Sequence, residues 1–352
     1  MDIRRSHIFG WVLAAALAFS WVAGISRGAE SPVTEPATAR VVVVHDALAT
    51  DAFRPRSDRV RELVSRGLTR LTGKATVQAA WMSLITTQDV VGIKVNAAAG
   101  LAGTRPEVAA ALAESLLAAG LKPSQVVIWD RLSADLLSAG FNEVGKQLGV
   151  RVLSAHQAGY DESVAYTNFA LGHLAWTDHE FNRTGEEVGK RSFSTRLITK
   201  EITKIVNVPS LLNHYRAGVS GCLYTLALGS VDNIQRFESS PERLADVIPE
   251  LYAQENVLDK VVLNVVDALI AQYQGESQPL LHYATALNEL RFSRDPVALD
   301  VLSLKELAGL REFHQITSST NVTALVDRLY RENAPLLQLG VADPKRIQTD
   351  RN

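Results

Sequence analysis

The segment V-V-G-I-K-V-N-A-A-A-G-L-A-G-T-R-P-E, residues 90–107, contains a strand, a loop and a helix start in that order. Its first six residues are apolar except for Lys94, as is typical of a strand buried on both faces. Small residues follow at 97–103. Thr104 and Glu107 then have the spacing of a capping box, with Pro106 in the first helical turn. A buried strand followed by a capped helix is the repeating unit of an α/β fold.

The same unit recurs on both sides of this segment. Short apolar runs stand at residues 41–44, 126–129 and 204–208, and helical patterns follow them. We therefore predict an α/β domain over residues 40–315, built on a mainly parallel sheet with helices on both faces. An irregular insertion is expected at residues 159–191. Residues 316–352 are expected to form a C-terminal helix and tail.

The amino terminus has the layout of a secretory signal peptide. Arg4 and Arg5 precede an apolar run at residues 8–25, and small residues follow near 26–29. The paired arginines also permit a twin-arginine signal, and about 18 apolar residues are just enough for an uncleaved membrane anchor. We expect residues 1–29 to be a signal or anchor and residues 30–39 a linker. The protein is then periplasmic, or anchored facing the periplasm, with no other membrane contact.

Composition limits the partners and cofactors. The formal net charge is −2, so there is no basic excess for binding nucleic acid. The single cysteine, Cys222, cannot hold an iron–sulfur cluster, which normally needs about four thiolates. A redox role would thus require a separate partner protein, and any other cofactor is unknown. The densest group of metal-ligand residue types is His173, Asp178, His179 and Glu180, but its spacing matches none of the usual zinc motifs. We predict no metal site.

The candidate site lies where the predicted strands end. Ligands of open parallel sheets bind at the carboxyl edge. Lys94 stands inside an apolar strand, where an ammonium needs a carboxylate or a ligand anion. The helix start at Thr104, with Arg105 beside it, offers backbone N–H groups and a positive dipole end to an anion. Alternatively, Lys94 reaches solvent at the sheet edge, and the other polar residues merely belong to loops.

We expect these residues to converge on a small-molecule ligand. The predicted ligand-binding residues are Lys94, Asn96, Thr104, Arg105, Asn207, Arg216, Arg236 and Asp300, and the predicted acid–base residues are His214, Asp130 and Asp267. Histidine suits proton transfer because its ordinary pKa is near neutrality. The alternative for His214 is a capping or core role.

Several motifs resemble, in order, those of the uncharacterised bacterial family called domain of unknown function 362. They are V-G-I-K-V-N (91–96), T-R-P-E (104–107), I-W-D (128–130), I-V-N-V-P (205–209) with His214, A-G-V-S-G-C-L-Y-T-L-A-L-G-S-V-D-N (217–233), L-N-V-V-D-A-L (263–269) and S-R-D-P-V-A-L-D (293–300). The resemblance implies an α/β domain, an export signal in many members and no established reaction. Some members carry a ferredoxin-type module with clustered cysteines, which this chain lacks.

The chain departs from the family pattern at three places. Lysine is common where Leu211 and Leu212 stand, Lys-Asn is common in place of Tyr224 and Thr225, and a histidine often falls near Glu238. Two interpretations stay open. One is an exported enzyme, or former enzyme, acting on a small anionic or polyhydroxy molecule. The other is a non-catalytic exported ligand-binding or scaffold protein, or an accessory to a redox partner.

Overall fold

The computed structural model of the protein describes residues 38–168, 170–238, 240–316 and 323–352. The expected signal or anchor, most of the expected linker and residues 317–322 of the expected C-terminal segment lie outside this part of the chain. No helix in the described ranges is long and apolar enough to cross a membrane.

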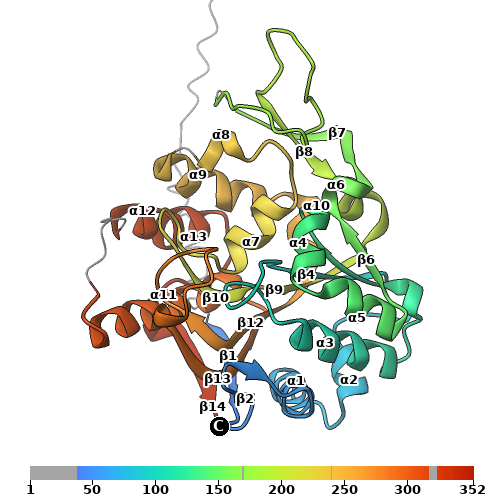
Figure 1. The fold of residues 1–352 in the computed structure, drawn as a ribbon, viewed down its shortest axis with the longest axis vertical. Helices are drawn as coiled ribbons and strands as arrows, with labels where there is room; N and C mark the ends of the chain where they lie inside the picture. Colours follow the sequence, from blue (N-terminus) through green and yellow to red (C-terminus); the bar gives the residue numbers. More distant parts are fainter. Residues whose placement is uncertain (1–37, 169, 239, 317–322) are drawn as a thin grey trace, which may run out of the picture. The chain divides into compact units, whose positions relative to one another are not determined.

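One large, mainly parallel sheet organises the described chain (Figure 1). Its strands run in the order β14-β1-β13-β12-β9-β4-β5-β6, and β10 and β11 extend it beside β12. Their bounds are β1 Ala39–His45, β4 Val91–Val95, β5 Val126–Asp130, β6 Arg151–Ser154, β9 Lys204–Val208, β10 Ser210–His214, β11 Gly218–Val219, β12 Val261–Gln272, β13 Ala284–Ser293 and β14 Ile347–Arg351. All four strands predicted first from the sequence, β1, β4, β5 and β9, belong to this one sheet. The α/β prediction is confirmed. Three pairs of neighbours depart from the parallel pattern, because β13 runs antiparallel to both β12 and β1, and β11 runs antiparallel to β10.

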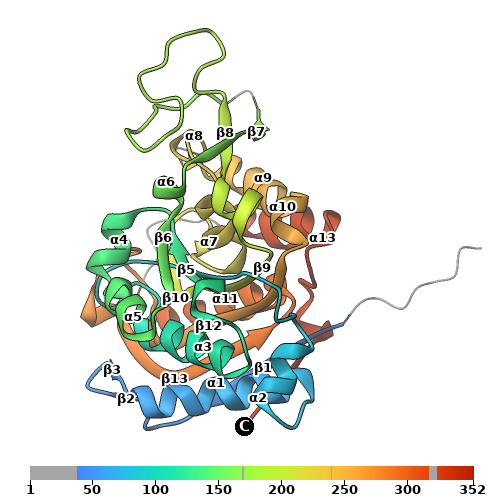
Figure 2. The same cartoon turned by 90° about the vertical axis from the view of Figure 1, so that its right-hand side faces the viewer.

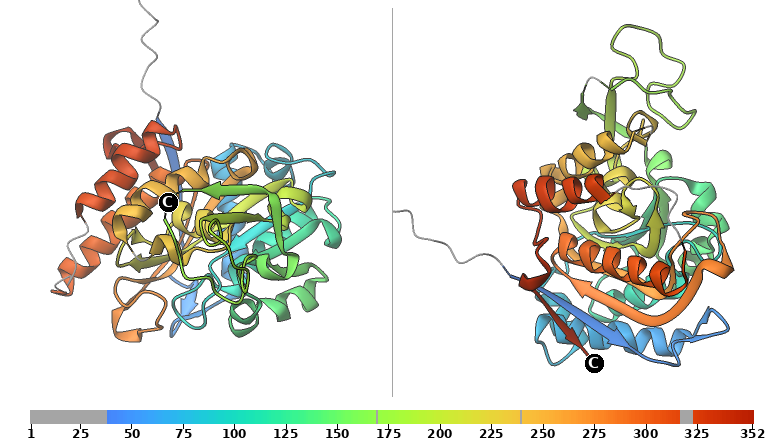
Figure 3. Two further views of the ribbon diagram at one scale, coloured as in Figure 1. Left: turned by 90° about the horizontal axis from the view of Figure 1, so that it is seen from above. Right: turned by 90° about the vertical axis from the view of Figure 1, so that its left-hand side faces the viewer.

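Helices cover both faces of the sheet (Figures 2 and 3). One face carries α1 (Ser57–Thr72), α2 (Val77–Met82), α3 (Pro106–Ala118) and α5 (Phe141–Leu148), and the other carries α7 (Cys222–Gly229), α9 (Pro241–Tyr252) and α11 (Pro296–Phe313). The four-valine run of β1 shows why. Val42 and Val44 pack into the core on the α1 side, and Val41 and Val43 into the core on the α7 side. A strand with apolar side chains on both faces needs a helical layer on each.

The strand order places a topological switch between β4 and β9. From β4 the chain proceeds through β5 to β6 on one side, and then returns to β9 and β12 on the other side. The carboxyl ends of β4 and β9 are therefore neighbours at the point where the winding direction reverses. Such a point is where open α/β sheets usually hold a ligand.

The predicted insertion has more regular structure than its composition suggested. It begins and ends as an antiparallel pair, β7 (Tyr160–Thr167) and β8 (Arg191–Thr195). Residues 168–190, which we call the excursion loop, connect these strands and project from the body (Figures 1 and 2). Two short helices precede it at the carboxyl edge of the sheet, α4 (Ser133–Ser138) and α6 (Ala155–Ala158).

The expectation of a C-terminal tail is wrong for the last residues. After α12 (Thr323–Asp327), a π-helical turn at Arg328–Asn333 and α13 (Ala334–Leu336), the chain returns to the sheet as β14. β14 pairs in parallel with β1 at the sheet edge. Its sequence, I-Q-T-D-R, has only one apolar residue because this edge strand is largely exposed. It therefore lacks the apolar pattern by which a strand is recognised.

Candidate functional site

A row of polar residues crosses the centre of the sheet beneath α7. Lys94 on β4 lies opposite Trp129 on β5 and Asn207 on β9, and Asn207 lies opposite Asn264 on β12. Register partners share a face of the sheet. All four residues are buried, and Lys94 is only 1% exposed. Two of the predicted ligand-binding residues, Lys94 and Asn207, thus lie inside the protein.

The Lys94 ammonium is paired within the fold. Its Nζ donates to Oδ1 of Asp130 and to the carbonyl of Val95, both at 2.7 Å, and lies 5.5 Å from the centre of the Trp129 ring. Burial lowers the pKa of Lys94, and the negative charge of Asp130 opposes that shift. A Cβ atom on Gly229 would lie 2.3 Å from Cε of Lys94. Glycine at the end of α7 therefore lets the helix close over the lysine.

Asp130 lies at the end of β5 and has partners on both oxygens. Oδ1 accepts the backbone N–H of Arg131 at 2.7 Å in addition to the Lys94 ammonium, and Oδ2 accepts the N–H of Ala97 at 2.6 Å. The residue is 9% exposed. It is thus the point where the buried Lys94 pair reaches the carboxyl edge of the sheet.

The capping box predicted at Thr104 is wrong. Helix α3 begins at Pro106 with Arg105 as its N-cap, and no side chain caps it. The Thr104 hydroxyl instead accepts the N–H of Asn96 at 2.9 Å and donates to the Val208 carbonyl at 2.6 Å. It therefore joins the loop after β4 to the end of β9.

At the start of α3, where the sequence predicted a bound ligand anion, the structure has the carboxylate of Asp267. The N–H of Arg105 donates to Oδ2 of Asp267 at 2.7 Å. Asp267 is fully buried, which raises its pKa, and the nearby Arg105 charge opposes that rise. The start of α3 thus serves to hold Asp267 in the core, and Asp267 has no contact with solvent.

His214, at the end of β10, is bound by backbone groups. Its Nδ1 accepts the N–H of Ala217 at 3.0 Å and of Arg216 at 3.3 Å, while the Arg216 side chain is exposed. Burial lowers the pKa of His214 to about 4, and the Arg216 charge adds to the shift. The ring is therefore neutral at pH 7, and the accepting role of Nδ1 puts its proton on Nε2.

Two departures from the family pattern touch each other beside His214. The Tyr224 ring lies 4.3 Å from the His214 ring, and its hydroxyl donates to Oε1 of Glu238 at 2.9 Å. Burial and the Glu238 charge raise the pKa of Tyr224. A tyrosine hydrogen-bonded to a glutamate thus stands where the family more often has a lysine and a histidine.

Two more predicted ligand residues hold the fold together. Asp300 on α11 accepts the N–H groups of Cys222 and Leu223 and so caps α7. Arg236, on the short helix α8 (Gln235–Glu238), is fully buried. Its guanidinium donates to acceptors on both sides of the excursion loop, among them the Tyr166 carbonyl at 2.8 Å and the Ser192 hydroxyl at 3.0 Å. Neither side chain is open to a ligand.

Arg131 was missing from the predicted site, although it directly follows Asp130. It is half-buried at the carboxyl end of β5. Among the described residues its guanidinium has neither a hydrogen bond nor an ion pair. Its positive charge lowers the pKa values of Lys94, Asp135, Tyr160 and Tyr224. The signal for Arg131 was its place directly after a buried strand.

No group of three or more His, Cys, Asp or Glu residues in the described ranges could hold a metal ion. In the dense group of metal-ligand residue types at residues 173–180, the two carboxylates of Asp178 and Glu180 have other partners. The Asp178 carboxylate accepts the N–H groups of Ala175 and Asn233. The Glu180 carboxylate is paired with Arg191 at 2.5 Å.

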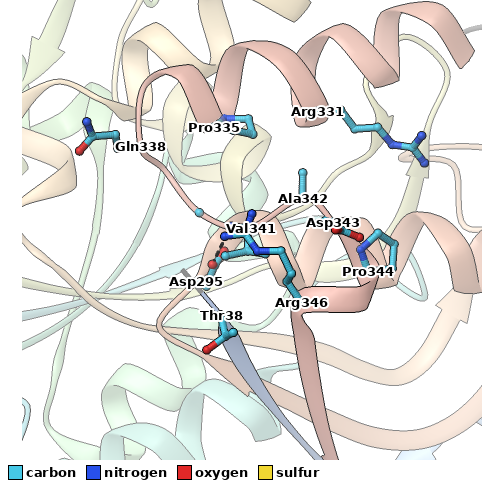
Figure 4. A pocket seen from close by; sticks show the side chains of 11 residues that line it. Thr38, Asp295, Arg331, Pro335, Gln338, Val341, Ala342, Asp343, Pro344 and Arg346 are labelled. Carbon is cyan, nitrogen blue, oxygen red and sulfur yellow. Dashed lines mark hydrogen bonds between the residues drawn. The ribbon is translucent and has the colours of Figure 1, made fainter. Parts of the chain in front are cut away.

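None of the predicted site residues lines the large cavity of about 920 Å³ beside Asp295 (Figure 4). Two of its charged side chains already have partners. Asp295 accepts the N–H of Ala298 at 2.8 Å and of Val341 at 2.8 Å, and Arg331 pairs with Asp327. Size alone therefore does not make this cavity the better candidate, and Arg131 remains the stronger one.

Comparisons with known proteins identify a family but no activity. The model of the family described as "Domain of unknown function (DUF362)" matches residues 91–305. A crystal structure of a Thermotoga maritima protein is similar with a TM-score of 0.41 and 11% identity, covering 74% of this chain and 59% of that one. The chain thus spans less than two thirds of that protein. No curated protein matches. Because the family model covers well over half of the sequence, the chain belongs to the DUF362 family.

Proposed function

We propose that this DUF362 protein is exported and binds a small anionic molecule at the carboxyl edge of its sheet, with Arg131 as the residue that pairs with the anion. The proposal is carried by Arg131, a half-buried residue whose guanidinium has no hydrogen bond or ion pair within the described part of the chain. A guanidinium at the carboxyl edge of the sheet that has no carboxylate partner in the protein is available to an anion from solution. Its planar fork of donors fits a carboxylate or a phosphate.

The surroundings of Arg131 favour binding over catalysis. Asp267 has no exposed surface and is held by Arg105. His214 is a weak base with a pKa of about 4, and its Nδ1 is occupied by backbone N–H groups. Asp267 therefore has no accessible group for proton exchange, and the ring of His214 is a poor base near neutral pH.

Catalysis is the second candidate, because one observation favours it. Asp130 is the acid–base candidate that both adjoins Arg131 and keeps some exposure, at 9%. It is coupled to Lys94, whose pKa burial lowers. A lysine–carboxylate pair of this kind can relay a proton to a molecule bound at Arg131.

Anion binding is tested by calorimetric titration of the purified protein with phosphate and with glycolate. Arg131→Gln removes the charge and is expected to weaken binding at least tenfold. Arg54→Gln, which removes an exposed arginine outside the predicted site, is the matched control and should bind as the wild type does. Equal affinities for wild type and Arg131→Gln would refute the assignment. Native mass spectrometry of protein purified from its own host would identify the anion.

Export rests on the sequence of residues 1–29, with Arg4 and Arg5 before an apolar run. Amino-terminal sequencing of the protein from its host tests it. A mature chain beginning near residue 30 in the periplasmic fraction is the expected result, and an intact Met1 in the cytoplasmic fraction would contradict it.

A further inference from the structure

We infer that the anion bound at Arg131 is carried by a sugar, and that the pyranose ring stacks on Trp176. The inference rests on the proposed function and narrows its ligand to an anionic sugar, such as a hexuronate or a sugar phosphate. Its starting point is that Trp176 is 69% exposed, whereas the other described tryptophans, Trp81 and Trp129, are fully buried. Exposure of one apolar side chain is ordinary, so its position and anchoring must carry the inference.

Trp176 is held at the same edge of the sheet as Arg131. His156 on α6, which directly follows β6, connects the two. The backbone N–H of His156 donates to the Arg131 carbonyl at 3.2 Å. The His156 ring meets the Trp176 ring edge to face, with centroids 5.0 Å apart, and its Nδ1 lies 3.2 Å from the Thr177 carbonyl. His156 thus links the ring of Trp176, in the excursion loop, to the backbone of Arg131 at the carboxyl end of β5.

The turn that presents Trp176 is fixed before any ligand arrives. The Asp178 N–H donates to the Ala175 carbonyl at 2.9 Å, and the Asp178 carboxylate accepts the Ala175 N–H at 2.6 Å. The other oxygen of that carboxylate accepts the N–H of Asn233 at 2.8 Å, which ties the turn to the body. Because the backbone is already ordered, stacking on Trp176 has a small entropic cost.

The combination of groups matches a charged sugar. A pyranose presents an apolar face of C–H groups, which packs on an indole, and hydroxyls around its rim, which need hydrogen-bond partners. Asp135 and Tyr160 supply such partners near Arg131. Asp135 lies on α4, four residues after Arg131, and Tyr160 begins β7 directly after α6, the helix that carries His156. A simple anion would use Arg131 and leave Trp176 without a role.

The test measures separately how much the sugar ring and the negative charge contribute to the affinity. The full-length protein is titrated with D-glucuronate (ring and charge), glycolate (charge without ring) and D-glucose (ring without charge). We expect glucuronate to bind about tenfold more tightly than glycolate, an advantage within the range of an aromatic packing contact. Trp176→Ala should abolish this advantage and leave glycolate binding unchanged, while Trp176→Phe should keep part of it. Leu171→Ala, another exposed residue of the excursion loop at 64% exposure, is the matched control.

Fluorescence gives an independent readout. Glucuronate should shift the emission of the wild type, and the Trp176→Phe variant should lack this shift. A parallel titration with D-glucose 6-phosphate shows whether the protein prefers a phosphate or a carboxylate on the sugar. A parallel titration with oligogalacturonate shows whether it prefers a free sugar or the end of a polymer. Unchanged glucuronate affinity in Trp176→Ala would overturn the inference and leave anion binding at Arg131 intact. Failure of glycolate, phosphate and glucuronate alike to bind would overturn the proposed function itself.

Discussion

The carboxylate of Asp300, on α11, accepts the backbone N–H of Cys222 at 2.6 Å, where α7 begins. Asp300 is fully buried, and a Cβ on the preceding Gly221 would lie 2.1 Å from its Oδ1. At its other end α7 rests on Lys94 through Gly229. Helix α7 is therefore fixed at both ends by buried charged groups, and its stability is tied to their ionisation.

The first prediction concerns pH. Burial raises the pKa of Asp300 to about 7 in the folded protein, against about 3.9 in an unfolded chain. Between these values the folded state binds more protons, so the contribution of Asp300 to stability is fully present below about pH 4 and falls as pH rises to about 7. The slope is at most about 1.4 kcal/mol per pH unit for one group. Urea unfolding of wild type and Asp300→Asn at several pH values should show a shallower slope in the variant.

Asp232 provides the comparison for this experiment. It is buried in another place, accepts the N–H groups of His179 and Phe193, and has a pKa that burial raises to about 7. Asp232→Asn should remove the contribution of Asp232 to the pH dependence of the free energy of unfolding. The double variant should show the smallest pH dependence. Identical slopes in wild type and both single variants would show that neither carboxyl titrates in this range.

The second prediction concerns the Lys94–Asp130 pair. Lys94→Met leaves Asp130 at 9% exposure without its cation, and breaking a buried pair typically costs about 3–5 kcal/mol. Asp130→Asn in the same chain removes the unpaired charge, so the double variant should recover part of the loss. Chemical denaturation of the three proteins measures it. A Lys94→Met protein as stable as the wild type would show that Asp130 is adequately held by the N–H groups of Ala97 and Arg131.

The third prediction concerns the excursion loop. Arg236→Met removes the donor that joins Tyr166 on β7 to Ser192 on β8, and the buried acceptors lose their partner, each at about 1–3 kcal/mol. Limited proteolysis within residues 168–190 should become markedly faster. Arg183→Met, an exposed arginine of the same loop, should not change the rate. Equal rates for the two variants would mean that other contacts hold the loop.

The sequence predicted the sheet because the strands buried on both faces have an unmistakable apolar pattern. Strands β1 and β4 can be predicted from the valines of β1 and the run V-V-G-I-K-V around β4 without knowledge of the tertiary structure. The edge strand β14 escaped notice because its side chains face solvent and carry charge. A strand can thus be predicted from the sequence where burial requires apolar side chains. It cannot be predicted where the strand is exposed and is held in the sheet only by backbone hydrogen bonds.

The candidate site was predicted less well, for a reason that Lys94 and Asp267 illustrate. Both are polar residues in apolar surroundings, and the sequence correctly marks them as needing partners. It does not tell whether the partner is a ligand or another residue of the chain. Here the partners are Asp130 and the N–H of Arg105. Arg131 was overlooked because its distinguishing property, a lack of partners, exists only in three dimensions.

The last prediction uses two glycines in helices. Replacing glycine by alanine inside a helix usually stabilises it by about 0.5–1 kcal/mol, because the unfolded chain loses freedom. Gly309, in α11, has no atom within 4 Å of the position of a Cβ, so Gly309→Ala should show this gain. Gly229→Ala should do the opposite, because its Cβ would lie 2.3 Å from Cε and 2.8 Å from Nζ of Lys94. The lysine cannot move aside without leaving Asp130, so the clash acts on the buried pair itself.

Thermal unfolding should place the Gly309→Ala midpoint above the wild type and the Gly229→Ala midpoint below it. Adding Lys94→Met to Gly229→Ala should then cost less than Lys94→Met costs alone, since both changes disrupt one interaction. Fully additive losses would show that α7 and the Lys94–Asp130 pair are independent.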